Sequence, residues 1–150
     1  MMQIIVQSQI TNSSGETDEM TLYTEATCRK DLRKTYVMYE ETEISGMENM
    51  KTLLIYDGEQ VQIKRFGQTD SVLTIKVDEV IENQYHTPYG MFIMSTRGRS
   101  IKWHFEQELD IELRYSLDIQ GERSEVKIKI ESKRNENVEE GRSEQGTKQS

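Results

Sequence analysis

Arg65 is the residue whose position in the sequence has the clearest chemical consequence. It follows Val61 and Ile63 at alternate positions, so on a β-strand all three side chains share one face, which the two apolar residues should turn inward. A guanidinium stays charged at neutral pH, and burying it without partners costs several kcal/mol. Arg65 therefore has to meet a carboxylate, several carbonyl groups or a bound anion.

Glu41 is the expected partner of Arg65, because it shares an alternating face with Tyr39. Glu40 takes this place if a β-bulge shifts the register by one residue. Two interpretations stay open. One is a buried ion pair that fixes the strand register and closes one end of the fold. The other is a cavity in which Arg65, Tyr39 and Tyr115 recognise an acidic or polar small molecule.

The segment Tyr85-His86-Thr87-Pro88-Tyr89-Gly90 contains the only proline of the sequence. Proline presets its own φ angle and favours an extended conformation for the residue before it, and Gly90 can take a positive φ where a turn ends. The segment predicts a rigid corner between two strands. The alternative is a lid over the mouth of a cavity, in which Tyr85 and Tyr89 face a ligand.

Patterns typical of catalysis or metal binding are missing from the sequence. Glu40 and Glu41 are adjacent, so on a strand their carboxylates point to opposite faces and cannot work as an acid–base pair. His86 lies in the expected turn, His104 lies on an expected wet face, and Cys28 has no second cysteine for a zinc site. No glycine-rich phosphate loop, dinucleotide fingerprint or serine-nucleophile motif occurs. The sequence predicts a protein that is not an enzyme and uses neither a metal nor a cofactor.

These side chains must be positioned by β-strands, because the apolar residues recur with a period of two. Between Glu108 and Ile119, six apolar residues alternate without a break with charged or polar ones. On a strand this pattern gives one apolar face and one polar face, whereas on a helix the same residues would be spread around the whole circumference. The segment predicts a long strand with one buried face.

Shorter segments on both sides repeat this alternation. Ser100–Phe105 places Trp103 on its apolar face, and the dipeptides Asp57-Gly58 and Arg97-Gly98 have the residue types of tight hairpin turns. The other expected strands are residues 20–28, 35–41, 52–56, 61–66, 91–96 and 125–131. The regular spacing of short strands indicates an antiparallel meander.

The predicted fold class is all-β, an antiparallel up-and-down β-barrel of about eight to ten strands. A single open sheet would leave its apolar face uncovered, whereas a barrel buries that face and removes both sheet edges. A barrel of this size is filled by side chains or holds one small ligand. A two-sheet β-sandwich is the alternative architecture.

Length and charge limit the organisation of the chain. It has 150 residues, with 27 acidic against 19 basic side chains and a formal net charge of -8. We expect one domain over residues 1–132 and a disordered tail over residues 133–150, where Val138 is the only apolar residue. The negative charge argues against binding to nucleic acid or an anionic membrane. The single cysteine, the lack of a long apolar run and the lack of a secretory signal predict a cytoplasmic protein.

Four short segments together resemble a known family. They are Tyr36-Val37-Met38-Tyr39-Glu40-Glu41, Lys64-Arg65-Phe66-Gly67, the proline-containing segment 85–90, and Tyr115-Ser116-Leu117. Over about residues 2–131 the chain resembles the YwiB-like family of small bacterial proteins, and the Tyr-x-Thr-Pro-Tyr-Gly element is the most specific part. The resemblance implies a calycin-like, lipocalin-type β-barrel and no particular activity, since the family is a domain of unknown function. It also leads us to expect a small-residue turn near positions 78–81, where this chain has Asp78-Glu79-Val80-Ile81.

The functional prediction combines the barrel with the inward cation. We expect a non-enzymatic cytoplasmic β-barrel that binds a small, partly apolar or acidic ligand in its interior. The candidate ligand-binding residues are Tyr39, Glu41, Arg65, Tyr85, Tyr89, Trp103 and Tyr115. The alternative is a solid-cored protein-interaction or regulatory module, working as a monomer or a homodimer.

Overall fold

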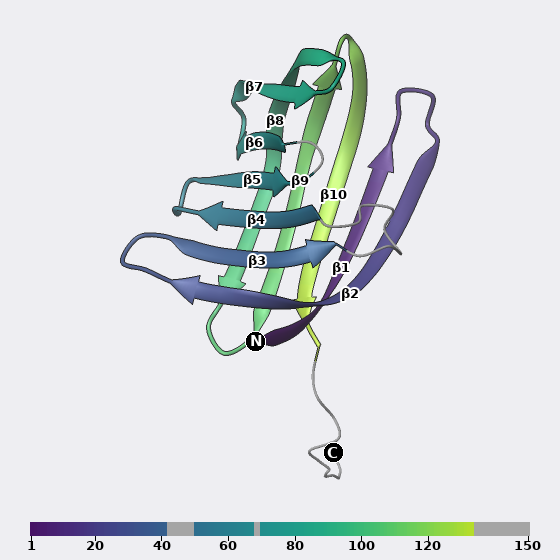
Figure 1. The fold of residues 1–150 in the computed structure, drawn as a ribbon. Helices are drawn as coiled ribbons and strands as arrows, with labels where there is room; N and C mark the ends of the chain where they lie inside the picture. Colours follow the sequence, from purple (N-terminus) through teal and green to yellow (C-terminus); the bar gives the residue numbers. More distant parts are fainter. Residues whose placement is uncertain (42–49, 68–69, 134–150) are drawn as a thin grey trace.

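A computed structural model describes residues 1–41, 50–67 and 70–133 of the chain. Ten antiparallel strands within these ranges close into a barrel (Figure 1). They are β1 (Met2–Thr11), β2 (Thr17–Lys30), β3 (Thr35–Glu41), β4 (Met50–Tyr56), β5 (Gln60–Phe66), β6 (Asp70–Lys76), β7 (Val80–Thr87), β8 (Gly90–Phe105), β9 (Leu109–Ile119) and β10 (Glu122–Ser132).

The strands follow an up-and-down order. Each strand pairs with the next one along the chain, and β10 pairs with β1, so the sheet closes on itself. This order confirms the predicted antiparallel barrel and excludes the sandwich alternative. Figure 1 shows the short strands β3 to β7 stacked across the long strands β8, β9 and β10. The two groups of strands therefore enclose one interior.

The apolar residues of the alternating segments form the core inside the barrel. In β9, Leu109, Ile111, Leu113 and Tyr115 are buried, and the residues between them face outward, as the sequence predicts. Val61 and Ile63 of β5, Val37 of β3 and Ile4 of β1 belong to the same core. Burying one such aliphatic side chain contributes about 1.5–3 kcal/mol, so this core is the main source of stability.

The predicted hairpin turn at Arg97-Gly98 is wrong. Strand β8 runs without interruption from Gly90 to Phe105, and a β-bulge between Gly98 and Ser100 takes the place of the turn. Gly98 is needed because a Cβ atom there would lie 2.5 Å from the backbone oxygen of Lys76. The glycine therefore marks a close backbone approach inside a strand and not a chain reversal.

The turn between β6 and β7 shows how Asp78-Glu79 replaces the expected small residues. Asp78 adopts a positive φ of 64° and donates its backbone N–H to the carbonyl of Gly98. Glu79 N donates to Lys76 O, which closes the turn. Aspartate tolerates this left-handed conformation better than most residues. The small residue at this place is Gly98 of β8, whose carbonyl accepts the hydrogen bond from Asp78 N.

Strands β6 and β7 form a seam in which side chains replace part of the backbone pairing. Within the described ranges, the two strands share two paired positions, Asp70 with His86 and Ser71 with Tyr85. Beyond them, Asn83 accepts a hydrogen bond from Thr74 N at 3.0 Å through Oδ1 and donates one to Ile81 O through Nδ2. The buried side-chain amide of Asn83 thus replaces a backbone peptide group as the hydrogen-bond partner of Thr74 N between the two strands.

The tail predicted for residues 133–150 lies outside the described residues except for Lys133, whose backbone N–H donates to Gln3 O. No helix of the described residues is long and apolar enough to cross a membrane.

Candidate functional site

A polar cluster lies inside the barrel where β3, β4 and β5 run side by side. Glu41 is 6% exposed and Thr52 is fully buried, although both side chains are polar. Thr52 Oγ1 donates a hydrogen bond of 2.8 Å to Glu41 Oε2, and Arg65 Nε lies 3.6 Å from the same carboxylate oxygen. One carboxylate oxygen therefore serves both a hydroxyl and a guanidinium.

The alternation along the strands is what turns these groups inward. Arg65 follows Val61 and Ile63, and Glu41 follows Val37 and Tyr39, at every second position, and the four apolar or aromatic residues are buried. Glu40 is exposed on the outer face. The predicted pairing of Arg65 with Glu41 is confirmed, and Glu40 is not the partner.

Arg65 is only partly enclosed. Its side chain is 24% exposed, against 5% for the Glu41 side chain, so the guanidinium lies between the packed interior and solvent. Its Nε atom is buried and makes no hydrogen bond to the described residues, because 3.6 Å is too long for one. A guanidinium carries five N–H donors, more than one carboxylate can accept. Arg65 therefore has N–H donors beside the barrel interior that Glu41 does not use.

Two buried tyrosines belong to the same cluster. Burial raises the pKa of Tyr39 to about 12, partly offset by the Arg65 charge, while the Glu41 charge raises it further. Burial also raises the pKa of Tyr115, and the Arg65 charge again opposes the shift. Both rings are therefore neutral hydroxyl donors at physiological pH, set near the cation from β3 and from the opposite strand β9.

A transverse row of paired residues extends the cluster toward β7. Tyr39 pairs with Thr52, Thr52 with Arg65, Arg65 with Ser71, and Ser71 with Tyr85. Tyr39 and Thr52 are buried, whereas Arg65, Ser71 and Tyr85 are half-buried. The solvent exposure of the inward side chains thus increases along the row from Tyr39 to Tyr85, so Tyr85 lies at the end that solvent can reach.

Trp103 belongs to an aromatic pair on the inner side of the barrel. Its ring stacks on Tyr56, with ring centroids 5.0 Å apart and an angle of 24° between the planes. Its indole Nε1 is buried and has no hydrogen-bond partner among the described residues. Both rings pack against the barrel core, so Trp103 lines the interior as an apolar group.

Tyr89 is placed in solvent, with 93% of its surface exposed. It lies in the turn between β7 and β8, where Thr87 Oγ1 donates to Gly90 O and accepts from Tyr89 N. Gly90 has the positive φ expected of it, at 127°. The turn is confined to Pro88 and Tyr89, because Tyr85, His86 and Thr87 belong to β7 and Gly90 begins β8, and Tyr89 takes no part in the buried cluster.

Thr52, Tyr56 and Ser71 were not among the residues selected from the sequence. Thr52 and Tyr56 both fall on the inward face of β4 together with Leu54, so alternation was the signal that could have found them. Ser71 becomes recognisable only through its pairing with Arg65. For metal binding, the described ranges contain no group of three or more His, Cys, Asp or Glu that could hold an ion.

The class of protein follows from this architecture. It is a closed ten-stranded antiparallel β-barrel, counted over the described ranges, with an ion pair and neutral phenols inside. The chain belongs to the family described as Domain of unknown function (DUF1934), whose model matches residues 4–131. Its fold is similar to that of the ywiB protein from Bacillus subtilis, with a TM-score of 0.73 and 18% sequence identity over 89% of this chain and 92% of that chain. The search of curated proteins gives no match.

Proposed function

We propose that this protein is a non-enzymatic, cytoplasmic binding protein that holds a small, acidic or polar and partly apolar molecule inside its barrel. The observation that carries the proposal is the environment of Arg65, an inward cation with a buried Nε donor and a quarter of its side chain accessible. Barrels of this size enclose at most one small ligand. No cofactor, metal or nucleic acid is required for this role.

The surroundings of Arg65 determine what such a ligand would look like. Its acidic or polar group would meet the guanidinium and the neutral hydroxyls of Tyr39 and Tyr115, which are hydrogen-bond donors below their raised pKa values. Its apolar part would contact Tyr85 and the aliphatic core. Because Glu41 already balances the charge of Arg65, the ligand must be small enough to reach the remaining donors without displacing the carboxylate.

Native mass spectrometry of the protein purified from its own host tests for a retained small molecule. Anilinonaphthalene sulfonate, an anionic aromatic compound, serves as the probe for the site. We expect saturable binding of one probe molecule, weakened about tenfold in Arg65→Met, since losing one charge-assisted hydrogen bond has this effect. Arg65→Lys retains the charge and should retain part of the binding, which keeps the test valid if Arg65→Met folds poorly.

Lys64→Met is the matched control, because Lys64 is the neighbouring cation on the outer face of β5. It should leave the affinity for the probe unchanged. The uncharged analogue phenylnaphthylamine should bind wild type and Arg65→Met equally. Equal binding of the sulfonate to wild type and Arg65→Met, with no retained molecule in the mass spectrum, would overturn the proposal.

The second candidate function is a protein-interaction module with a solid core. It is favoured by apolar side chains on the outer face of the β7–β8 hairpin, where Met91 and Ile93, two positions apart on β8, are each at least half exposed. An exposed apolar patch is typical of an interaction surface. Sedimentation of wild type and Ile93→Lys over a range of concentrations tests it, because only this function predicts self-association or partner binding that the lysine abolishes.

A further inference from the structure

The outer surface of β8, β9 and β10 carries a group of cationic side chains that the barrel interior does not use. We call it the basic face; its residues are Arg97, Arg99, Arg114, Arg123 and Lys127. The backbone pairing puts Arg114 directly opposite Lys127, and Arg97 opposite Ser116. Like charges on directly opposed positions of a sheet are destabilising. The Arg114–Lys127 position is therefore unfavourable by itself, and the ion pair of Arg114 with Glu112 offsets part of this cost.

The β-bulge in β8 adds one of these cations. Gly98 pairs with Tyr115 and Ser100 with Arg114, so Arg99 is an extra residue without a partner position on β9. A β-bulge of this kind changes the direction in which the inserted side chain points. The bulge also keeps Ile101 on the inner face. Its effect is to place Arg99 on the outside beside Arg97 while the core pattern continues.

A buried serine organises the centre of the basic face. Ser116 is 3% exposed although it lies on the outer side of β9. Its Oγ accepts a hydrogen bond of 3.1 Å from Arg99 Nε and donates one of 2.8 Å to Glu125 Oε2. Glu125 lies 3.6 Å from Arg99 and 3.9 Å from Arg123. One carboxylate is thus shared by two arginines.

The positive charge of this face is not fully balanced. Besides Glu125, Glu112 pairs with Arg114 at 3.2 Å, and Asp118 lies directly opposite Arg123 in the register and accepts a hydrogen bond from Gly121 N. Of the five cations, Arg99, Arg114 and Arg123 form ion pairs with carboxylates. Among the described residues, the Arg97 side chain has neither a hydrogen bond nor an ion pair.

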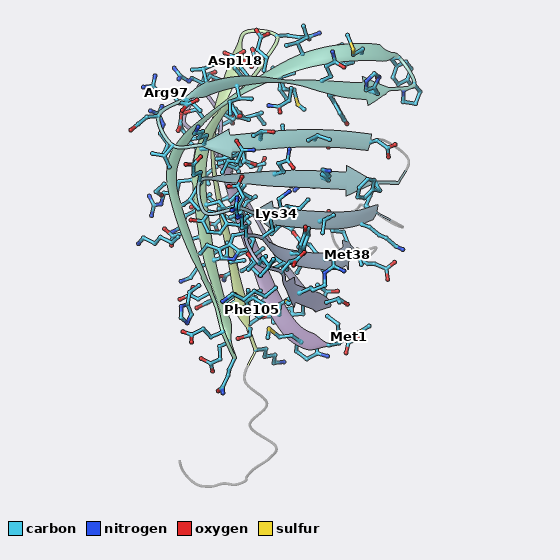
Figure 2. All side chains as sticks on the ribbon, turned by 90° about the vertical axis from the view of Figure 1, so that its left-hand side faces the viewer. Met1, Lys34, Met38, Arg97, Phe105 and Asp118 are labelled. Atoms are coloured by element: carbon cyan, nitrogen blue, oxygen red, sulfur yellow. The ribbon has the colours of Figure 1, made fainter. Side chains whose placement is uncertain are left out.

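Two hollows flank the bonded group of Arg99, Ser116 and Glu125. The first has a volume of about 370 Å³, and its polar lining comes from Arg97, Ser116, Asp118 and Arg123 together with Ser95 and Thr96. The second has about 460 Å³ and is lined by Arg99, Arg114, Glu125 and Lys127. In Figure 2, Arg97 and Asp118 lie together at the end of the barrel opposite Met1 and Phe105. The first hollow therefore lies where β9 ends and β10 begins, beside the middle of β8.

We propose that the basic face binds a small molecule through a phosphate group, seated in the first hollow between Arg97 and Arg123. Arginine presents a planar set of donors that matches phosphate oxygens, and Arg97 has no competing carboxylate partner in the described part of the chain. A small phosphate compound fits better than a nucleic acid, because a chain with a net charge of -8 repels an extended polyanion beyond this face.

The test follows the arginine side-chain resonances of isotope-labelled full-length protein by NMR during titration with sodium pyrophosphate and, separately, with glycerol phosphate, at constant ionic strength. Saturable shifts of the Nε–H signals of Arg97 and Arg123 are expected. The affinity should fall about tenfold in Arg97→Gln and in Arg123→Gln. The two probes distinguish a diphosphate from a phosphate monoester as the preferred group.

Lys51→Gln is the control, because it makes the same change in net charge on the outer face of β4. It should leave both titrations unchanged. An equal loss of affinity in Lys51→Gln, or shifts that grow linearly without saturation, would show only general electrostatic attraction and overturn the proposal. Tighter binding of a single-stranded oligonucleotide than of either probe would assign the face to nucleic acid and overturn it as well.

Discussion

Glu41 and Arg65 meet across an intervening strand. Glu41 ends β3 and Arg65 lies near the end of β5, and β4 runs between them, with Thr52 paired to Arg65 in the register. The Glu41 carboxylate extends across β4 to Arg65 and also accepts a hydrogen bond from the hydroxyl of Thr52 on that strand. The ion pair therefore connects three strands, and a one-residue shift of any of them would turn one of its members outward.

Replacing Glu41 by Gln should lower the free energy of unfolding by about 1–3 kcal/mol, because it leaves the Arg65 guanidinium partly buried without a counter-charge. The accessible part of Arg65 is screened by solvent, so the lower half of this range is expected. Urea unfolding measures the change. Glu40→Gln, on the outer face, should have little effect.

The double variant Glu41→Gln/Arg65→Met separates the pair from its individual members. It should recover part of the stability that Glu41→Gln loses, because both charges are then removed from the interior. Strictly additive losses in the double variant would contradict a direct interaction between the two groups.

The stability of the barrel should fall as pH rises from about 10 to about 12. Burial raises the pKa of Tyr39 from 10.0 to about 12, so in this range the unfolded chain releases a proton that the folded protein retains. The stabilising contribution is complete below pH 10 and decreases by up to about 1.4 kcal/mol per pH unit above it. Urea unfolding at several alkaline pH values measures the slope.

Tyr39→Phe should reduce this alkaline slope, since the titrating hydroxyl is removed. Part of the slope should remain, because the pKa of Tyr115 is raised as well. Tyr23→Phe, a change to an exposed ring, is the control and should leave the slope as it is in wild type. An identical slope in Tyr39→Phe and wild type would show that Tyr39 does not titrate differently in the folded protein.

The features that alternation determines could be read from the sequence. A period of two assigns each residue of a strand to the inside or the outside, so Arg65, Glu41 and Tyr39 could be placed in the interior without any structure. The up-and-down order also followed, because short turns between strands leave few other connections. The closed barrel is the way in which such strands bury their common apolar face.

Features that depend on contacts between distant segments could not be read in this way. From the sequence, Gly98 was predicted to be a turn residue. Its actual role is to allow the close approach of the Lys76 backbone at the end of β6, and Lys76 lies more than twenty positions away in the sequence. Tyr85 and Tyr89 have the same residue type, but one lies on an inward row and the other at a turn tip. Local residue types do not encode such tertiary relations.

Asn83→Leu should open the seam between β6 and β7. Leucine has a similar size but cannot accept the hydrogen bond from Thr74 N, and a buried N–H without an acceptor costs about 1–3 kcal/mol. Hydrogen exchange of the Thr74 amide, followed by NMR, should become faster. The exposed amide of Gln84 gives the control, since Gln84→Leu should leave Thr74 protected. Unchanged protection in Asn83→Leu would mean that the Asn83 amide does not replace a backbone group.

Gly98→Ala should destabilise the barrel, although alanine by itself would favour the folded state. Replacing glycine by alanine restricts the unfolded chain and gains about 0.4–1 kcal/mol where the backbone conformation allows it. At Gly98 the added Cβ would lie 2.5 Å from the Lys76 carbonyl oxygen and 2.9 Å from Val77 N, and backbone atoms cannot rotate away as a side chain can.

The overpacking at Gly98 should therefore outweigh the entropic gain and give a net loss of about 1–3 kcal/mol. Thermal or urea unfolding measures it against Ser100→Ala, a small change on the other side of the same bulge, which should stay within about 0.5 kcal/mol of wild type. A Gly98→Ala variant as stable as wild type would mean that β6 and β8 can move apart without loss. The close contact between β6 and β8 would then contribute nothing to the stability of the seam between β6 and β7.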